Sequence, residues 1–135
     1  MTQEDLEEYN QQLKEKRDKY REVIESFPKN QEDYSTTDWI TYNDYYEVQN
    51  ILRSIQVELV RREQRLEDES LSSLQEIAHD AYRAARRMQN YDWDVVERSS
   101  DENQEGFWRQ VDFLETLEAA ANLESDRREY MSMHG

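Results

Sequence analysis

Histidine is the side chain that catalysis at neutral pH recruits most often, and the sequence has two, His79 and His134. His134 is the penultimate residue, a position where a chain is usually mobile. His79 follows Glu76 by three residues, the spacing with which helical bundles hold a di-iron centre, because residues i and i+3 project from one helix face. Such a centre needs a second Glu-x-x-His motif, and the sequence has none. We therefore expect no metal, with His79 at the solvent edge of a helix.

Other catalytic groups are either missing or uninformative. The sequence has no cysteine, which excludes a disulfide framework, a thiolate metal site and a cysteine nucleophile. Its glycines are Gly106 and Gly135, whereas phosphate-binding loops, dinucleotide fingerprints and nucleophile elbows need several glycines close together. With 32 acidic residues, no single pair of carboxylates stands out as a general acid and base. We expect a protein that is not an enzyme and that binds no cofactor.

The balance of charge argues against direct binding of nucleic acid. The 135 residues include 17 Lys and Arg and 32 Asp and Glu, a formal net charge of −15 that repels phosphate at long range. We expect the clustered arginines to pair with acids across helices or with an acidic patch on a partner. These arginines are Arg61, Arg62, Arg65, Arg83, Arg86 and Arg87.

The elements that position these side chains are predicted to be helices. Two glycines and one proline are too few for a sheet with tight turns, and apolar residues recur at spacings of three, four and seven. Thr2 with Asp5 predicts a cap for the first helix, and Pro28 predicts its end near Phe27. The expected fold is all-α, an antiparallel bundle of about four helices with coiled-coil-like stripes, in a single domain over 1–135. The predicted helices are 3–27, 38–67, 71–89 and 101–130, with a loop at 28–37.

Two junctions are less clear. At 67–72, in a serine-rich stretch, the regular spacing of apolar residues is interrupted and resumes in a different register. This indicates either a tight turn between two helices or a kink in one helix, and we favour the turn. Ser73 with Glu76 matches a capping box for the helix that follows. Between 91 and 100 the pattern is weak, and one short helical turn around Trp93 is expected.

Two stretches combine acidic with aromatic residues. Residues 28–50 hold five acids and one lysine, residues 91–108 hold six acids and one arginine, and together they contain all three tryptophans. Such surfaces are typical of protein docking, where Tyr and Trp are favoured. Trp108 lies on the apolar row of the last helix and is interpreted as core. The predicted partner-binding residues are Trp39, Tyr45, Leu52, Leu59, Tyr91, Asp92, Trp93, Asp94, Glu97, Asp101, Glu102 and Glu105.

The apolar inventory is small for a self-sufficient core. Leu, Ile, Val and Phe make 25 of the 135 residues, near the level at which high net charge is usually accompanied by disorder. Nine tyrosines and three tryptophans add apolar area. We therefore expect help from a partner or from self-association, with the heptad row in 45–66 as the predicted stripe.

These observations favour a non-enzymatic, acidic helical module for protein–protein interaction, such as an adaptor, chaperone or inhibitor that docks on a basic protein surface. The alternative is a nucleic-acid mimic that occupies the basic groove of a DNA- or RNA-binding protein. The 17 basic residues count against the mimic because they dilute its field. No apolar run approaches the roughly 18 residues of a membrane span, and the N-terminus is acidic where a signal peptide is basic. We expect no membrane contact and a cytoplasmic location.

Overall fold

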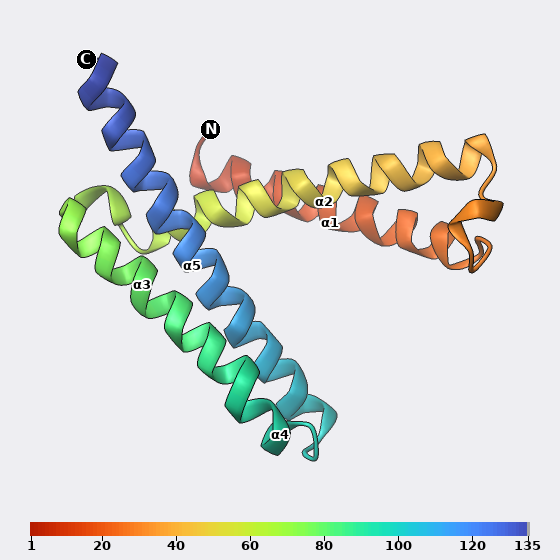
Figure 1. The fold of residues 1–135 in the computed structure, drawn as a ribbon. Helices are drawn as coiled ribbons and strands as arrows, with labels where there is room; N and C mark the ends of the chain where they lie inside the picture. The colour runs from red at the N-terminus through yellow and green to blue at the C-terminus, as the bar shows by residue number, and fades with distance from the viewer. Residues whose placement is uncertain (135) are drawn as a thin grey trace. The chain divides into compact units, whose positions relative to one another are not determined.

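The computed structural model describes residues 1–134, and every regular element among them is helical (Figure 1). The all-α fold class predicted from the sequence is therefore confirmed. The long helices are α1 (Gln3–Glu25), α2 (Thr36–Glu63), α3 (Leu71–Arg87) and α5 (Asp101–His134). The short elements are the 3-10 helices η1 (Gln31–Asp33) and η2 (Leu66–Asp68), the π-helical segment η3 (Met88–Asp92) and the single turn α4 (Trp93–Val96).

The backbone contacts divide the chain into two compact units, which are described separately below. Unit 1 comprises Met1–Leu59, and unit 2 begins at Val60, so the division falls within α2. The prediction of a single domain over 1–135 stays a prediction, as does the coiled-coil packing of the apolar stripes.

Unit 1 is a hairpin in which α1 and α2 run antiparallel (Figure 1). The predicted cap of α1 is present. The Thr2 hydroxyl accepts a hydrogen bond from the Asp5 backbone N–H at 3.1 Å, and the Asp5 carboxylate accepts one from the Thr2 backbone N–H at 3.2 Å. Hydrogen bonding to the Asp5 carboxylate, first from the Thr2 backbone N–H and then from the Thr2 side chain, holds the pKa of Asp5 below its usual value. α1 ends at Glu25, shortly before Pro28.

The core of unit 1 is thin and aliphatic. Tyr20 and Leu59 pack against its edge. Leu52 is 2% exposed, so it belongs to this core and is not available to a partner, which corrects its assignment to a docking stripe. Leu59 is half-buried against the same cluster. The buried residues are Leu6, Leu13, Val48, Leu52 and Ile55.

The chain turns between α2 and α3 and does not kink, as predicted. α2 ends at Glu63, and Arg65 adopts the left-handed conformation with φ 49° and ψ 46° before η2 begins. Ser70 then caps α3, because its hydroxyl accepts a hydrogen bond from the Ser73 backbone N–H at 3.1 Å. The cap lies three residues before the predicted Ser73, since Ser70 has the extended backbone that an N-cap needs.

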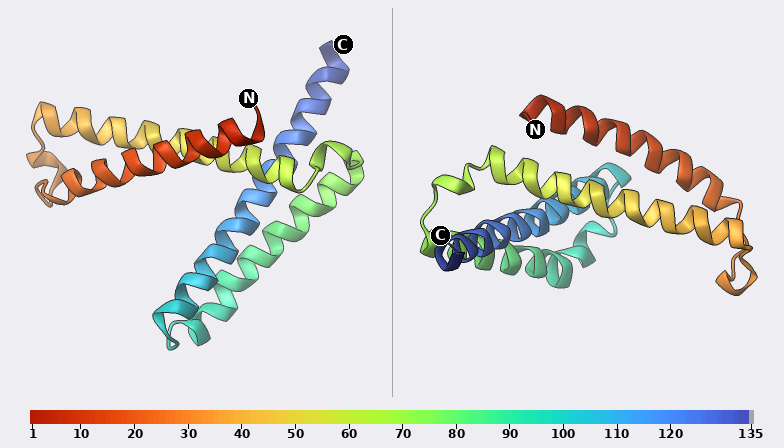
Figure 2. Two further views of the ribbon diagram at one scale, coloured as in Figure 1. Left: turned by 180° about the vertical axis from the view of Figure 1, so that it is seen from behind. Right: turned by 90° about the horizontal axis from the view of Figure 1, so that it is seen from above.

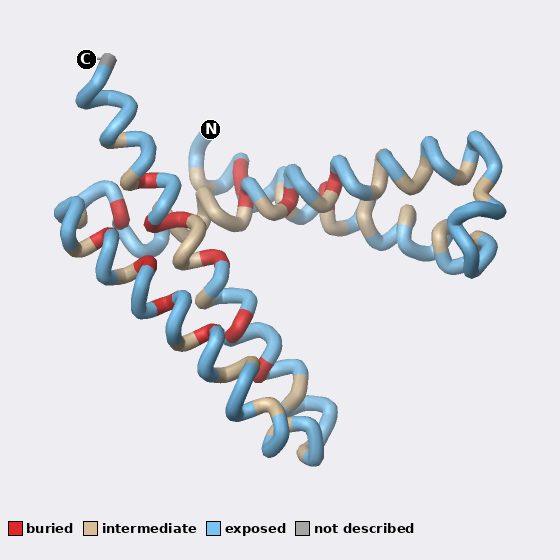
Figure 3. The backbone as a smooth tube through the Cα atoms, viewed as in Figure 1, coloured by how far each residue is buried: buried red, intermediate tan, exposed pale blue. Residues whose placement is uncertain are grey.

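α3 and α5 lie side by side in unit 2, as Figures 1 and 2 agree. Much of the surface that they share is made of alanine, which allows two helix backbones to approach closely. The buried positions face each other along the pair (Figure 3). They are Leu74, Ala78, Ala81 and Ala85 on α3, and Phe107, Val111, Thr116, Ala120, Ala121 and Glu124 on α5.

Several other helices begin or end at residues that differ from the predicted ones. α5 extends to His134 where the pattern predicted an end near 130. α3 passes at Met88 into η3 with helical backbone angles, so the helical path continues into the predicted short turn at Trp93, which is α4. The predicted loop 28–37 contains η1 and the start of α2.

Candidate functional site

His79 belongs to no cluster of metal-ligating side chains among the described residues. His79 and Glu76 are both exposed on α3. No group of three or more His, Asp or Glu side chains with the proximity of metal ligands occurs among the described residues. The side chain of His134 lies outside those described. The expectation that the protein holds no metal stays an expectation.

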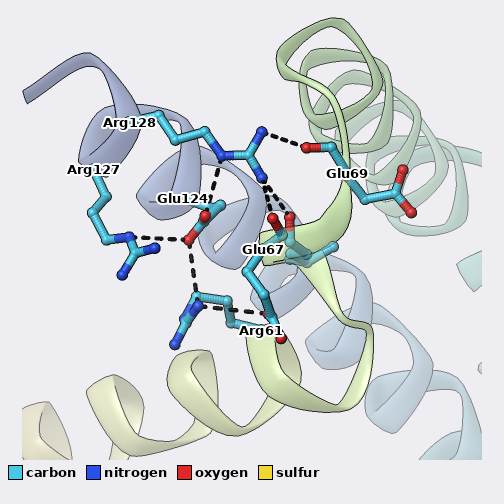
Figure 4. A network of polar contacts seen from close by, with 7 residues as sticks. Arg61, Glu67, Glu69, Glu124, Arg127 and Arg128 are labelled. Atoms are coloured by element: carbon cyan, nitrogen blue, oxygen red, sulfur yellow. Dashed lines mark hydrogen bonds and ion pairs between the residues drawn. The ribbon is translucent and has the colours of Figure 1, made fainter. Parts of the chain in front are cut away.

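Glu124 of α5 is the only charged residue that is buried among residues 1–133, and its side chain is 1% exposed. Three guanidinium groups surround its carboxylate, those of Arg61 at 3.4 Å, Arg127 at 3.4 Å and Arg128 at 3.2 Å (Figure 4). Arg61 also pairs with Glu67 at 3.6 Å. These cations offset the cost of removing the Glu124 charge from water. For Arg61, the predicted pairing with acids is confirmed.

Arg128 also binds the turn between α2 and α3. Its guanidinium donates hydrogen bonds to the carbonyl oxygens of Leu66 at 3.0 Å and Glu67 at 2.8 Å, and to that of Glu69 (Figure 4). Carbonyls in such a short 3-10 turn have few partners within their own element. The network therefore fastens α5 to η2. Every charge in it is engaged by the protein itself, so its role is structural.

The predicted residues Trp39 and Tyr45 belong to a cluster of six rings where the hairpin of unit 1 turns. The centroids of contacting rings lie 5.0–6.5 Å apart in edge-to-face geometry. Trp39 is 39% exposed and Tyr46 is 52% exposed, so the cluster closes the hairpin and still presents rings at the surface. A hydrogen bond with Tyr42 raises the pKa of Tyr46 above its usual value. The rings are Phe27, Tyr34, Trp39, Tyr42, Tyr45 and Tyr46.

A second aromatic cluster lies in unit 2, where α4 meets α5. Trp93, Phe107 and Trp108 contact one another with centroid distances of 5.1–5.3 Å. Phe107 is buried, whereas Trp108 is 47% exposed, which corrects the interpretation of Trp108 as core. Consecutive residues on a helix point about 100° apart, and here Phe107 turns to the interior while Trp108 stands at the edge of the buried face. Trp93 is half-buried against the other two rings.

Trp108 lines an open acidic groove of about 640 Å³ on α5, here called the Trp108 groove. The Trp108 groove is bounded by three carboxylates, Asp101, Glu105 and Asp112, whose spacings of four and seven place them on one helix face. The one cation in its lining is Arg109, which pairs with Glu105 at 3.5 Å while both side chains stay mostly exposed. Such exposed pairs are worth about 0–1 kcal/mol and are readily exchanged.

The structure does not gather the other predicted residues in the Trp108 groove. Asp92 is exposed on η3, Asp94 on α4 and Glu97 just after α4. Glu102 is exposed in the first turn of α5. Tyr91 is 74% exposed and lines a different groove, on α3.

Four residues of the Trp108 groove escaped the sequence analysis: Gln104, Trp108, Arg109 and Asp112. The signal for Trp108 is its place beside Phe107, because the second ring then lies about 100° around the helix, toward the edge of a buried face. Asp112 carries no such signal, because it is one of many acids.

No helix in the described part of the chain combines the length and apolar character needed to span a membrane. Compared with protein-family models, with curated proteins and with solved structures, the chain has no significant match. Its function must therefore be inferred from geometry and charge.

Proposed function

We propose that the protein is a non-enzymatic interaction module that docks a basic segment of a protein partner in the Trp108 groove. The observation that carries this proposal is the exposed indole of Trp108, set among the carboxylates of Asp101, Glu105 and Asp112. A lysine or arginine of the partner would lie over the indole face and pair with these carboxylates. Tryptophan is the residue type that most often dominates the binding energy of an interface.

The net charge of the chain also favours a basic partner. A formal charge of −15 steers basic partners toward the chain and raises the association rate at low salt. The exposed Glu105–Arg109 pair can give way to a partner cation at little cost, because both side chains are more than two-thirds exposed. A cytoplasmic location and self-association remain predictions from the sequence.

The test is capture of a partner from the native host, followed by association and dissociation rates for three variants. Trp108→Ala should speed dissociation about 30-fold, the equivalent of about 2 kcal/mol for a hot-spot residue. Asp101→Asn/Glu105→Gln should slow association and flatten its salt dependence. The matched control Asp92→Asn/Asp94→Asn makes the same change in net charge outside the groove and should have a smaller effect.

Two outcomes would contradict the proposal. Unchanged rates for Trp108→Ala would mean that the partner does not use the groove. Competition by duplex or single-stranded nucleic acid for the partner's binding surface would favour the nucleic-acid mimic in place of a protein-docking module.

A further inference from the structure

A groove of the opposite charge lies on α3, also in unit 2, with a volume of about 580 Å³. Its cations, Arg83, Arg86 and Arg87, stand at positions i, i+3 and i+4, so they share one exposed side of the helix. Asp80 is the one acid in the lining. We call this the arginine groove; its other polar lining residues are Tyr82, Asn90 and Tyr91.

These three arginines form no ion pair with any residue that the structure describes, in a chain with 32 acids. The contrast within unit 2 is sharp, because Arg127 and Arg128 both pair with Glu124. The expectation that the three arginines pair across helices is therefore not met. Like charges one turn apart repel by a few tenths of a kcal/mol, so the cluster does not stabilise α3 on its own.

A helix C-terminus would also favour cations, but although α3 ends at Arg87, the helical path continues through η3 and α4. The backbone at Met88 has φ −60° and ψ −48°, and helical angles continue at Asp92 and Trp93. The carbonyls near Arg86 and Arg87 therefore stay within a helical path, and the dipole of an exposed helix end does not account for the cluster.

Two tyrosines flank the cations and give the arginine groove the composition of a docking surface. The Arg86 guanidinium carbon lies 5.4 Å from the centre of the Tyr82 ring, which holds one guanidinium in place. Tyr91 is 74% exposed, and the π-helical segment that carries it is of a kind frequently found at functional sites. Arginine and tyrosine are both enriched among the residues that dominate binding energy.

We propose that the arginine groove binds a short acidic segment of a protein partner, with carboxylates paired to Arg83 and Arg87 and an apolar side chain against Tyr91. Charge complementarity selects this occupant, because guanidinium groups pair with carboxylates in a fork geometry. A long polyanion such as nucleic acid would meet the field of the whole chain, at −15, whereas a short segment carries few charges to be repelled. This site is separate from the Trp108 groove and would let one module hold partners of opposite charge.

The test uses the full chain and a fluorescent hexaglutamate peptide with blocked ends, measured by anisotropy at 50 mM NaCl, beside a hexaglutamine peptide of the same length. Wild type should bind hexaglutamate and not hexaglutamine. Arg83→Gln/Arg87→Gln should weaken binding at least tenfold. The control Lys19→Gln/Arg21→Gln removes two exposed cations of α1, which is the same change in net charge. Its affinity for hexaglutamate should stay within twofold of that of wild type. Circular dichroism checks that each variant keeps its helices.

Four results would overturn the proposal. If wild type does not bind hexaglutamate, the arginine groove is not a binding site. If both double variants weaken binding equally, the effect comes from net charge and not from the groove. Equal binding of a 12-nucleotide oligothymidine through the same arginines would make the groove a general polyanion surface. Self-association of the chain that is lost in Arg83→Gln/Arg87→Gln and kept in the control would make a second copy the occupant. The Trp108→Ala variant should bind hexaglutamate as wild type does, so failure here leaves the Trp108 groove untouched.

Discussion

Replacing Arg128 by alanine is expected to destabilise unit 2 by about 3–5 kcal/mol, the range seen when one partner of a buried ion pair is removed. The substitution takes a cation from the buried carboxylate of Glu124 and removes the Arg128 donor from three carbonyl oxygens at the η2 turn, of which that of Leu66 keeps the Glu69 N–H as a partner. Both losses act in the same direction, because each leaves a polar group with fewer partners away from water. Urea denaturation followed by circular dichroism measures the change in the free energy of unfolding.

The matched control is Arg127→Ala. Arg127 pairs with the same carboxylate at 3.4 Å, but its side chain is 60% exposed and makes no other ion pair or hydrogen bond with the described residues. Its loss should cost less than about 1 kcal/mol. Arg128→Lys keeps the charge without the fork that reaches several carbonyls, so its stability should fall between the two. Equal losses for Arg127→Ala and Arg128→Ala would show that the carbonyl contacts contribute nothing.

Leu74→Ala is expected to destabilise unit 2 by about 2–5 kcal/mol, the usual cost of truncating a fully buried leucine. Leu74 is 0% exposed, and the other buried residues of α3 are alanines, whose methyl groups are too short to fill the cavity. Thermal or urea unfolding monitored by circular dichroism measures the loss.

Leu71→Ala removes the same atoms three residues away, in the first turn of α3, where the leucine is 41% exposed. Its cost should stay below about 1 kcal/mol, because little apolar area is lost from the interior. If Leu71→Ala and Leu74→Ala cost the same, then α3 does not pack on α5 as described.

Local patterns in the sequence predict the helices well. Thr2, Asp5 and Pro28 act on backbone within a few residues, so the cap of α1 and the end of that helix follow from the sequence. The turn near 67–72 follows in the same way from a break in apolar phase. The capping-box pattern pointed to Ser73 because Glu76 follows it by three residues, whereas the actual cap, Ser70, is followed at that spacing by Ser73 and does not match the pattern.

Contacts between distant residues could not be predicted in this way. Arg61 and Glu124 lie 63 positions apart, so no local pattern marks Glu124 as the one acid, among 32, that is buried in the described chain. For the same reason the sequence does not show that Arg83 lacks an ion pair, because that depends on the position of every acidic side chain in the fold. The exposure of Trp108 is a tertiary fact too, because the choice between it and Phe107 depends on which face of α5 meets α3.

The most direct measurement of docking at the Trp108 groove follows the indole N–H signals of the three tryptophans by nuclear magnetic resonance. The probe is a hexaarginine peptide with blocked ends, added to the full chain at 50 mM NaCl, with the Trp108 signal assigned from Trp108→Phe. We predict a saturable shift of the Trp108 signal that Asp101→Asn/Glu105→Gln removes, with smaller shifts at Trp39 and Trp93. Equal shifts at all three indoles, or a Trp108 signal that does not move, would contradict docking in this groove.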